Sequence, residues 1–213
     1  MIRIKVFVFN PFMENTYVLY DDSRECIIVD PGCYTEEERN ALTSFIAAEN
    51  LRPVGLINTH THVDHILGNN FLHRTYGLKP IIHQAGELFL KSAPEHASIF
   101  GIEAERMVLP ENFLEDGDTF TFGNSALEIV YTPGHANGSI CLISHQDRFI
   151  LTGDVLFQGS IGRTDLPTGN FELLAESIQQ KIYTLPDDYV VYPGHGPHTT
   201  VGEEKQNNPF VNA

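Results

Sequence analysis

The chain has 213 residues, of which 42% are apolar and 19% are charged, as is typical of a globular protein. Its formal net charge of −15 disfavours nucleic acids and anionic membranes as partners, because binding to phosphates depends on Lys and Arg. No apolar run has the length of a transmembrane helix, and the start of the chain lacks the apolar segment of a signal peptide. We therefore expect a soluble protein with one domain over residues 1–213.

The three cysteines predict no disulfide framework, because none of them belongs to a C-x-x-C pair. Cys26 and Cys141 lie in apolar runs and are expected to be buried. Cys33 follows the turn at Pro31 and Gly32 and is the candidate for an exposed thiol. A chain without structural disulfides suits a reducing compartment, so we expect a cytoplasmic protein.

The first half of the chain is predicted to fold as strands followed by helices. Alternating apolar residues predict a β-meander of three strands, at residues 2–9, 15–20 and 26–30. Thr35, with Glu38 three residues later, predicts the start of a helix that ends near residue 50. The remaining elements are a strand at 54–58, a helix at 64–76, a strand at 80–83, a helix at 84–91 and a mixture of loop and helix at 92–109.

The second half repeats this order. Its predicted strands cover residues 118–122, 126–131, 139–144, 149–151 and 189–192. A long polar loop is expected at 155–170, a helix at 171–183 and a closing helix at 201–208. Strands before helices in both halves favour an α/β fold in which two mixed β-sheets pack together with helices on the outer faces, an αββα sandwich.

The segment Thr59–His65 concentrates residues that can bind metal ions. It contains His60, His62, Asp64 and His65 between a predicted strand and a predicted helix, a usual location for sites in α/β sheets. Imidazole and carboxylate groups are ligands for Zn, Fe and Mn. If the backbone is extended, His60 and His62 point to the same side and can share one metal ion. Asp64 and His65 lie beyond the bend, which suggests a second metal ion.

Three further candidate ligands each follow a predicted strand and have a glycine beside them. They are His135, Asp154 and His195. The neighbouring glycine lets the backbone bend and approach a ligand closely. Each of these turns would be ordinary by itself, but together with the histidine-rich segment they predict one composite metal centre. The other histidines are weaker candidates, namely His73, His83, His96, His145 and His198.

This series of residues resembles the metallo-β-lactamase superfamily, and the resemblance covers nearly the whole chain in the expected order. It implies the αββα fold and two metal ions. In the family, the residues that match His60, His62 and His135 hold the first ion, and those that match Asp64, His65 and His195 hold the second. The aspartate that matches Asp154 bridges both ions.

Within the superfamily the chain looks most like the glyoxalase II group, the hydroxyacylglutathione hydrolases, and especially its short bacterial relatives. The supporting stretches are residues 154–157, 159–165 and 208–210. Full-length members carry a C-terminal helical domain that helps to bind glutathione, and its binding residues have no counterpart in this sequence. The resemblance therefore implies thioester hydrolysis and leaves the acyl group, the thiol carrier and the oligomeric state open.

The implied reaction is hydrolysis of a small anionic thioester, such as S-lactoylglutathione, by a hydroxide that bridges two divalent metal ions. Metal ions lower the pKa of bound water to about 7, and a thiolate leaves without a strong general acid. Asp64 and Asp154 are the expected catalytic carboxylates, and Zn is the expected metal, with Fe or Mn as alternatives. Arg163 is expected either to bind a substrate carboxylate or to pair with Asp165.

A second candidate reaction is the oxidation of a persulfide by a dioxygenase of the same fold. Those enzymes share the His-x-His-x-Asp-His motif and a loop similar to residues 162–165, so the sequence does not separate the two activities. They use a single iron ion, bound by the residues that match His60, His135 and Asp154. A metal-binding protein without catalysis is disfavoured, because every ligand position of the family is filled.

Overall fold

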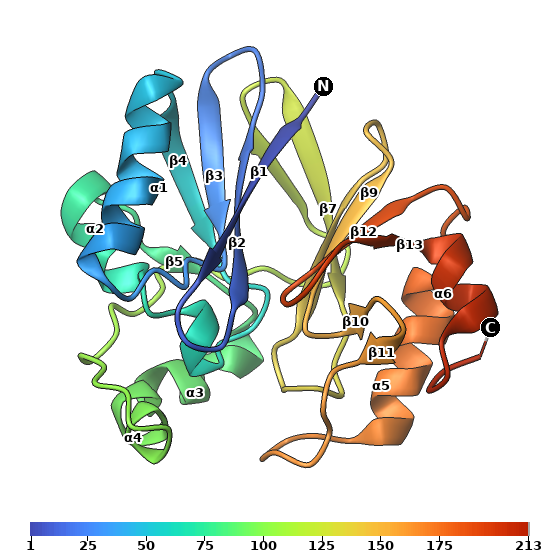
Figure 1. The fold of residues 1–213 in the computed structure, drawn as a ribbon. Coiled ribbons are helices and arrows are strands. Elements are labelled where there is room, and N and C mark those ends of the chain that lie inside the picture. Colours follow the sequence, from blue (N-terminus) through green and yellow to red (C-terminus); the bar gives the residue numbers. More distant parts are fainter. Residues whose placement is uncertain (213) are drawn as a thin grey trace.

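The computed structural model describes residues 1–212, and its strands form two sheets and a separate hairpin (Figure 1). The first sheet contains β1 (Arg3–Phe9), β2 (Glu14–Tyr20), β3 (Glu25–Val29), β4 (Arg52–Ile57) and β5 (Pro80–Ile81). The second contains β6 (Thr119–Phe122), β7 (Ser125–Tyr131), β8 (Ile140–Ser144), β9 (Phe149–Gly153), β12 (Val190–Pro193) and β13 (Thr199–Thr200). The hairpin consists of β10 (Leu156–Phe157) and β11 (Ser160–Ile161).

Both sheets are mixed, as the sequence predicted. The first has the order β1-β2-β3-β4-β5, in which β3, β4 and β5 are parallel and the other pairs are antiparallel. The second has the order β13-β12-β9-β8-β7-β6, in which only β12 and β9 are parallel. The helices are α1 (Glu36–Ala48), α2 (Asn69–Tyr76), α3 (Glu87–Lys91), α4 (Ala93–Ile99), α5 (Phe171–Ser177) and α6 (Val201–Asn207).

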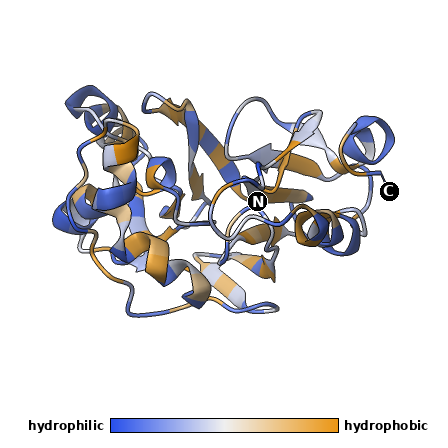
Figure 2. Cartoon of the chain, turned by 90° about the horizontal axis from the view of Figure 1, so that it is seen from below, coloured by the Kyte–Doolittle hydropathy of each residue, from blue (hydrophilic) through white to orange (hydrophobic). Residues whose placement is uncertain are grey.

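The three largest clusters of buried side chains lie between the two sheets and on the outer face of each sheet, which confirms the αββα sandwich. Alternate residues of a strand point to opposite faces. In β3, Ile27 packs between the two sheets and Ile28 packs towards α1. The outer face of the second sheet is covered by α5, whose Leu174 lies in one cluster with Ile150 of β9. Figure 2 shows the hydrophobic residues concentrated along the strands and the hydrophilic ones on the outer helices.

The helix predicted at residues 64–76 is shorter than expected. Val63–His65 form a single 3₁₀ turn, and α2 begins only later. The backbone carbonyls of Asp64 and His65 accept hydrogen bonds from the side-chain amides of Asn10 and Asn58, each at 2.9 Å. These carbonyls are therefore satisfied outside a helix, and the segment can hold its side chains in an irregular arrangement.

Three smaller expectations are also corrected. The loop predicted at 155–170 contains the hairpin β10–β11, whose strands of two residues are too short to show a pattern. The helix predicted at 171–183 changes after α5 into a π-helical turn at Ile178–Ile182. Cys33 is fully buried beside α1, so all three cysteines are free and buried. Within the described residues, every helix is too short or too polar to span a bilayer.

Candidate metal centre

The seven predicted ligands meet where loops leave strands of both sheets. His60 and its neighbours follow β4, whereas His135, Asp154 and His195 follow β7, β9 and β12. The last three strands run in the same direction, because β8 is antiparallel to both β7 and β9 and β12 is parallel to β9. Their loops therefore emerge at one edge of the second sheet, where they face the loop from β4.

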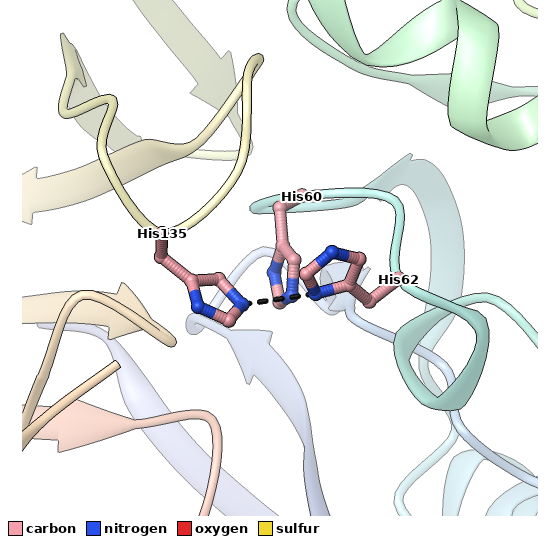
Figure 3. A group of neighbouring side chains, drawn as sticks. All are labelled: His60, His62 and His135. Atoms are coloured by element: carbon pink, nitrogen blue, oxygen red, sulfur yellow. Dashed lines mark hydrogen bonds between the residues drawn. The ribbon is translucent and has the colours of Figure 1, made fainter. Parts of the chain in front are cut away.

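The first group consists of His60, His62 and His135 (Figure 3). Each offers one ring nitrogen, and these nitrogens all lie within 4.8 Å of one another. Nε2 of His135 is 2.9 Å from Nδ1 of His62. Because the three rings converge from two different loops, one metal ion could be bound by all of them.

The second group consists of Asp64, His65 and His195, whose candidate ligand atoms also lie within 4.8 Å of one another. Nε2 of His195 is 3.1 Å from Oδ2 of Asp64, and Nε2 of His65 is 3.5 Å from the same oxygen. These residues come from the loop after β4 and the loop after β12, so the second group also joins the two sheets.

Asp154 lies between the two groups. Its Oδ1 is 3.4 Å from Nε2 of His65. Its Oδ2 is 3.6 Å from Nε2 of His135 and 3.6 Å from Nε2 of His195. One carboxylate therefore faces histidines of both groups, which is the placement that a bridging ligand needs.

Backbone carbonyls orient two of these histidines. Nδ1 of His135 is 2.8 Å from the carbonyl oxygen of Arg163, and Nδ1 of His195 is 3.1 Å from that of Phe12. A carbonyl can only accept a hydrogen bond, so in each ring Nδ1 donates and Nε2 keeps its lone pair. Such a partner fixes the tautomer and the direction of a metal-binding imidazole.

The loop that carries His195 is held by β2 of the other sheet. The backbone NH of Asn15 donates to the carbonyl of Gly194 at 2.7 Å. The side-chain amide of Asn15 donates to the carbonyls of Pro193 at 2.9 Å and Gly196 at 2.8 Å. The hydroxyl of Tyr17 also donates to Pro193, so this loop is fixed by contacts between the sheets.

Four buried atoms of the proposed ligands have no hydrogen-bond partner among the described residues: His60 Nε2, His65 Nδ1, His65 Nε2 and Asp154 Oδ1. A buried polar atom without a partner costs about 1–3 kcal/mol. Metal coordination would satisfy such atoms, and imidazole with carboxylate is a donor set for divalent ions. The residues present therefore fit the divalent metal ions that the fold implies.

The local electrostatics favour the ligand forms of His60, His62 and Asp154. Burial lowers the pKa of His60 well below its usual value and that of His62 to about 3, so both imidazoles are neutral at neutral pH. Burial by itself would raise the pKa of Asp154, but His65, His60 and His135 together outweigh it and hold this pKa well below the usual range. His65 shows the opposite shift, because Asp64, Asp154 and Asp30 together outweigh burial and raise its pKa. The carboxylates that favour a protonated His65 would equally attract a metal cation.

Arg163 is placed beside the centre, but its side chain pairs with Asp165. The guanidinium donates from Nε at 2.8 Å and from a terminal nitrogen at 2.7 Å to the two oxygens of that carboxylate. Both side chains are exposed. The alternative that the sequence left open, a pairing within the loop, is thus the arrangement in the structure.

Two acidic residues at the centre were missed by the sequence analysis. Asp30 accepts hydrogen bonds from the NH of Thr59 at 2.7 Å and from its hydroxyl at 2.6 Å, and its Oδ2 lies 3.2 Å from Nδ1 of His65. Glu14 is fully buried, with Oε1 3.9 Å from the same Nδ1. Asp30 could have been found, because it directly follows β3, which is parallel to β4, the strand before His60. Glu14 carried no comparable signal.

The αββα sandwich and its converging histidines and aspartates place this chain in the class of α/β proteins that bind metal ions. The chain belongs to the metallo-β-lactamase superfamily, whose family model matches residues 9–195. It is 37% identical to the hydroxyacylglutathione hydrolase GloC of Haemophilus influenzae, over 99% of each chain. It is also 37% identical to the probable metallo-hydrolase YqgX of Bacillus subtilis, over 95% of this chain and 94% of the relative.

Solved structures agree with this assignment. The B3 metallo-β-lactamase BLEG-1 superimposes with a TM-score of 0.90 at 33% identity, covering 99% of this chain and 100% of that one. TTHA1623 in a di-iron-bound form gives 0.87 at 29% identity, covering 97% and 100%. ETHE1 from Myxococcus xanthus gives 0.80 at 26% identity, covering 98% and 84%.

Proposed function

We propose that this protein is a metal-dependent thioester hydrolase of the glyoxalase II type that uses two divalent metal ions. The observation that carries the proposal is the position of Asp154 between two complete groups of ligands. The similarity to GloC over almost the full length of both chains supports a thioester as the substrate. Zn is the proposed metal, and Fe and Mn suit the same donors. The three free thiols support a cytoplasmic location.

In this proposal His60, His62 and His135 hold the first ion, and Asp64, His65 and His195 hold the second, with Asp154 shared. When bound, two divalent ions lower the pKa of water to about 7 and polarise a carbonyl group. The chain's own contribution is orientation: the carbonyls of Arg163 and Phe12 fix two of the rings. No strong general acid is required, because the thiolate is a good leaving group.

The persulfide dioxygenase remains the second candidate, because the His-x-His-x-Asp-His motif at residues 60–65 is common to both activities. The two reactions differ in their need for the second group of ligands. A single iron ion bound by His60, His135 and Asp154 would make no use of His195. The complete second group therefore favours the hydrolase.

Metal stoichiometry tests the proposal directly. Protein purified without chelators or added metal should contain two metal ions per chain and should hydrolyse thioesters. Asp154→Ala should lose at least one ion and reduce turnover by about 100-fold or more, because the shared ligand is removed. Full turnover with two ions in this variant would refute the scheme.

His195→Ala separates the two candidates. A binuclear hydrolase should lose its second ion and most of its thioesterase activity. A dioxygenase should keep one iron ion and still consume oxygen when glutathione persulfide is added. The matched control is His198→Ala, which alters an exposed histidine in the same loop and should leave metal content unchanged.

A further inference from the structure

A cavity of about 380 Å³ opens beside the metal centre. It is bordered by His62, Asp64, His135, Asp154 and His195, all of them proposed ligands. Its remaining walls are mainly apolar and include Phe12, Val63, Phe89, Ile99, Phe100 and Leu166. A group bound in this cavity would therefore lie directly beside the atoms that hold the metal ions.

The aromatic walls are packed against each other and against a proposed ligand. Phe12, from the loop between β1 and β2, meets Phe100, at the end of α4, edge to face at 5.5 Å. Phe89 of α3 meets the ring of His62 edge to face at 5.5 Å. These contacts come from segments far apart in the sequence, so the cavity is built by the fold and not by one loop.

Two of these apolar side chains are largely exposed. Ile99 is 75% exposed and Phe100 is 49% exposed. An apolar side chain gains roughly 25 cal/mol for each Å² that is removed from water. An apolar ligand group would cover such surface, which is the usual basis of binding in small-molecule pockets.

The cavity offers little to a charged ligand. Arg163 is the one Lys or Arg among its lining residues in the described chain, and its charge is paired with the carboxylate of Asp165, to which Nε and one terminal nitrogen donate. His96 is the other polar side chain of the walls apart from the proposed ligands. A tripeptide thiol with two carboxylates and an ammonium group would therefore find few partners inside it.

We infer that the substrate carries an uncharged apolar group, branched or aromatic, which binds in this cavity next to the scissile carbonyl. The inference rests on the proposed thioesterase function. A water molecule takes up about 30 Å³ in the liquid, so the volume of the cavity equals that of roughly a dozen water molecules. A group of about six to ten non-hydrogen atoms fits in this volume. The group belongs to either the acyl or the thiol side of the thioester.

Two substrate series test the inference on the metal-loaded protein. In the first, one small thiol carries acetyl, butanoyl, hexanoyl or phenylacetyl groups. In the second, an acetyl group is joined to thiols of increasing apolar size. In the series whose variable group enters the cavity, kcat/KM should rise about threefold for each added methylene. A kcat/KM that is independent of size in both series would overturn the inference.

A matched pair of variants ties the effect to the cavity. Ile99→Asp adds a charge to the wall, whereas Leu88→Asp adds the same charge to a residue of α3 that does not line the cavity. The two native side chains are 75% and 72% exposed, so both variants should fold. Ile99→Asp should remove most of the dependence on apolar size, and Leu88→Asp should keep it. An unchanged dependence in Ile99→Asp would contradict the inference.

Calorimetry with thioethers, which cannot be hydrolysed, distinguishes failure of the inference from failure of the proposed function. If affinity rises with the length of the S-alkyl chain but no thioester is hydrolysed, the thioesterase function is refuted and binding of apolar groups in the cavity is supported. Hydrolysis of S-lactoylglutathione at the same rate as all other thioesters, with affinity independent of chain length, would refute the inference and leave the thioesterase intact.

Discussion

Arg163 illustrates how one residue can act separately through its backbone and its side chain. Its carbonyl oxygen orients His135, and its guanidinium pairs with Asp165 at the border of the cavity. Only the second contact depends on the identity of the side chain. A substitution at this position should therefore leave the proposed metal centre intact, and it should have little effect on charged substrates, because the guanidinium is already paired.

We predict that Arg163→Ala keeps two metal ions per chain and changes kcat/KM by less than about threefold for a thioester that carries a carboxylate, because the guanidinium is already paired with Asp165. The uncharged amide of the same substrate should behave in the same way. Steady-state kinetics on both substrates and metal analysis provide the measurement, with Asp165→Ala, which releases the arginine, as the comparison. A loss of about tenfold confined to the carboxylate substrate would instead assign the arginine to substrate binding.

At the scale of single residues, the sequence indicated the proposed ligands but not the acidic residues that lie beside them. His135, Asp154 and His195 could be placed because each follows a strand and has a glycine beside it. Glu14 could not, because it begins β2 and reaches His65, which follows β4, only when β3 pairs between these two strands. Contacts that depend on packing leave no local pattern in a sequence.

At the scale of elements, Asp21 joins the end of β2 to the turn between β6 and β7. Its Oδ2 accepts hydrogen bonds from the NH of Asn124 at 2.7 Å and from the hydroxyl of Ser125 at 2.8 Å. Its Oδ1 accepts one from the NH of Ser23 at 2.8 Å. Burial opposes ionisation, but the hydrogen bonds from Ser23 and Ser125 prevail and lower the pKa of Asp21 from 3.8 to about 2.

This shift predicts a contribution to stability in acid. Because the pKa of Asp21 is lower in the folded than in the unfolded chain, its contribution is complete above about pH 4 and is lost as the pH falls towards about 2. Asp21→Asn should lower the free energy of unfolding at pH 7 by about 2 kcal/mol and weaken the loss below pH 4. Urea unfolding at pH 7 and pH 3 measures both effects. Asp22→Asn, at an exposed surface pair, should change little, and an equal effect of both variants would contradict the prediction.

The sequence misplaced an element where side chains from other segments of the chain form hydrogen bonds with its backbone. The helix at 64–76 was shortened because Asn10 and Asn58 take up the backbone carbonyls of Asp64 and His65. The long strands and α1, with its Thr35–Glu38 capping box, follow from local pattern and could be predicted.

At the scale of the molecule, the metal centre and the fold depend on each other. The proposed ligands come from both sheets, and four of their buried atoms lack partners among residues 1–212. Metal binding to such a site should stabilise the native state, because the unfolded chain does not hold the ligands together. We also propose that the chain unfolds as one domain, since the middle layer is shared by both sheets.

Removal of the metal ions with a chelator should therefore lower the melting temperature by about 10 °C, in a single transition. Differential scanning calorimetry provides the measurement, and added Zn should restore the original value. Asp154→Ala should respond less to the chelator, because it already lacks its shared ligand. An unchanged melting temperature after verified metal loss would show that the centre adds nothing to stability.

The hydrogen bonds between Asn15 and the loop at Gly194 have a consequence for synthesis of the chain. The residues that it joins lie near opposite ends of the sequence, so β2 leaves the ribosome long before the loop that it must hold. Contacts between such distant residues form late, because a large loop of chain has to close first. His195 can take its place only after this closure. In the proposed binuclear centre, binding of the second ion would therefore follow the folding of the whole chain.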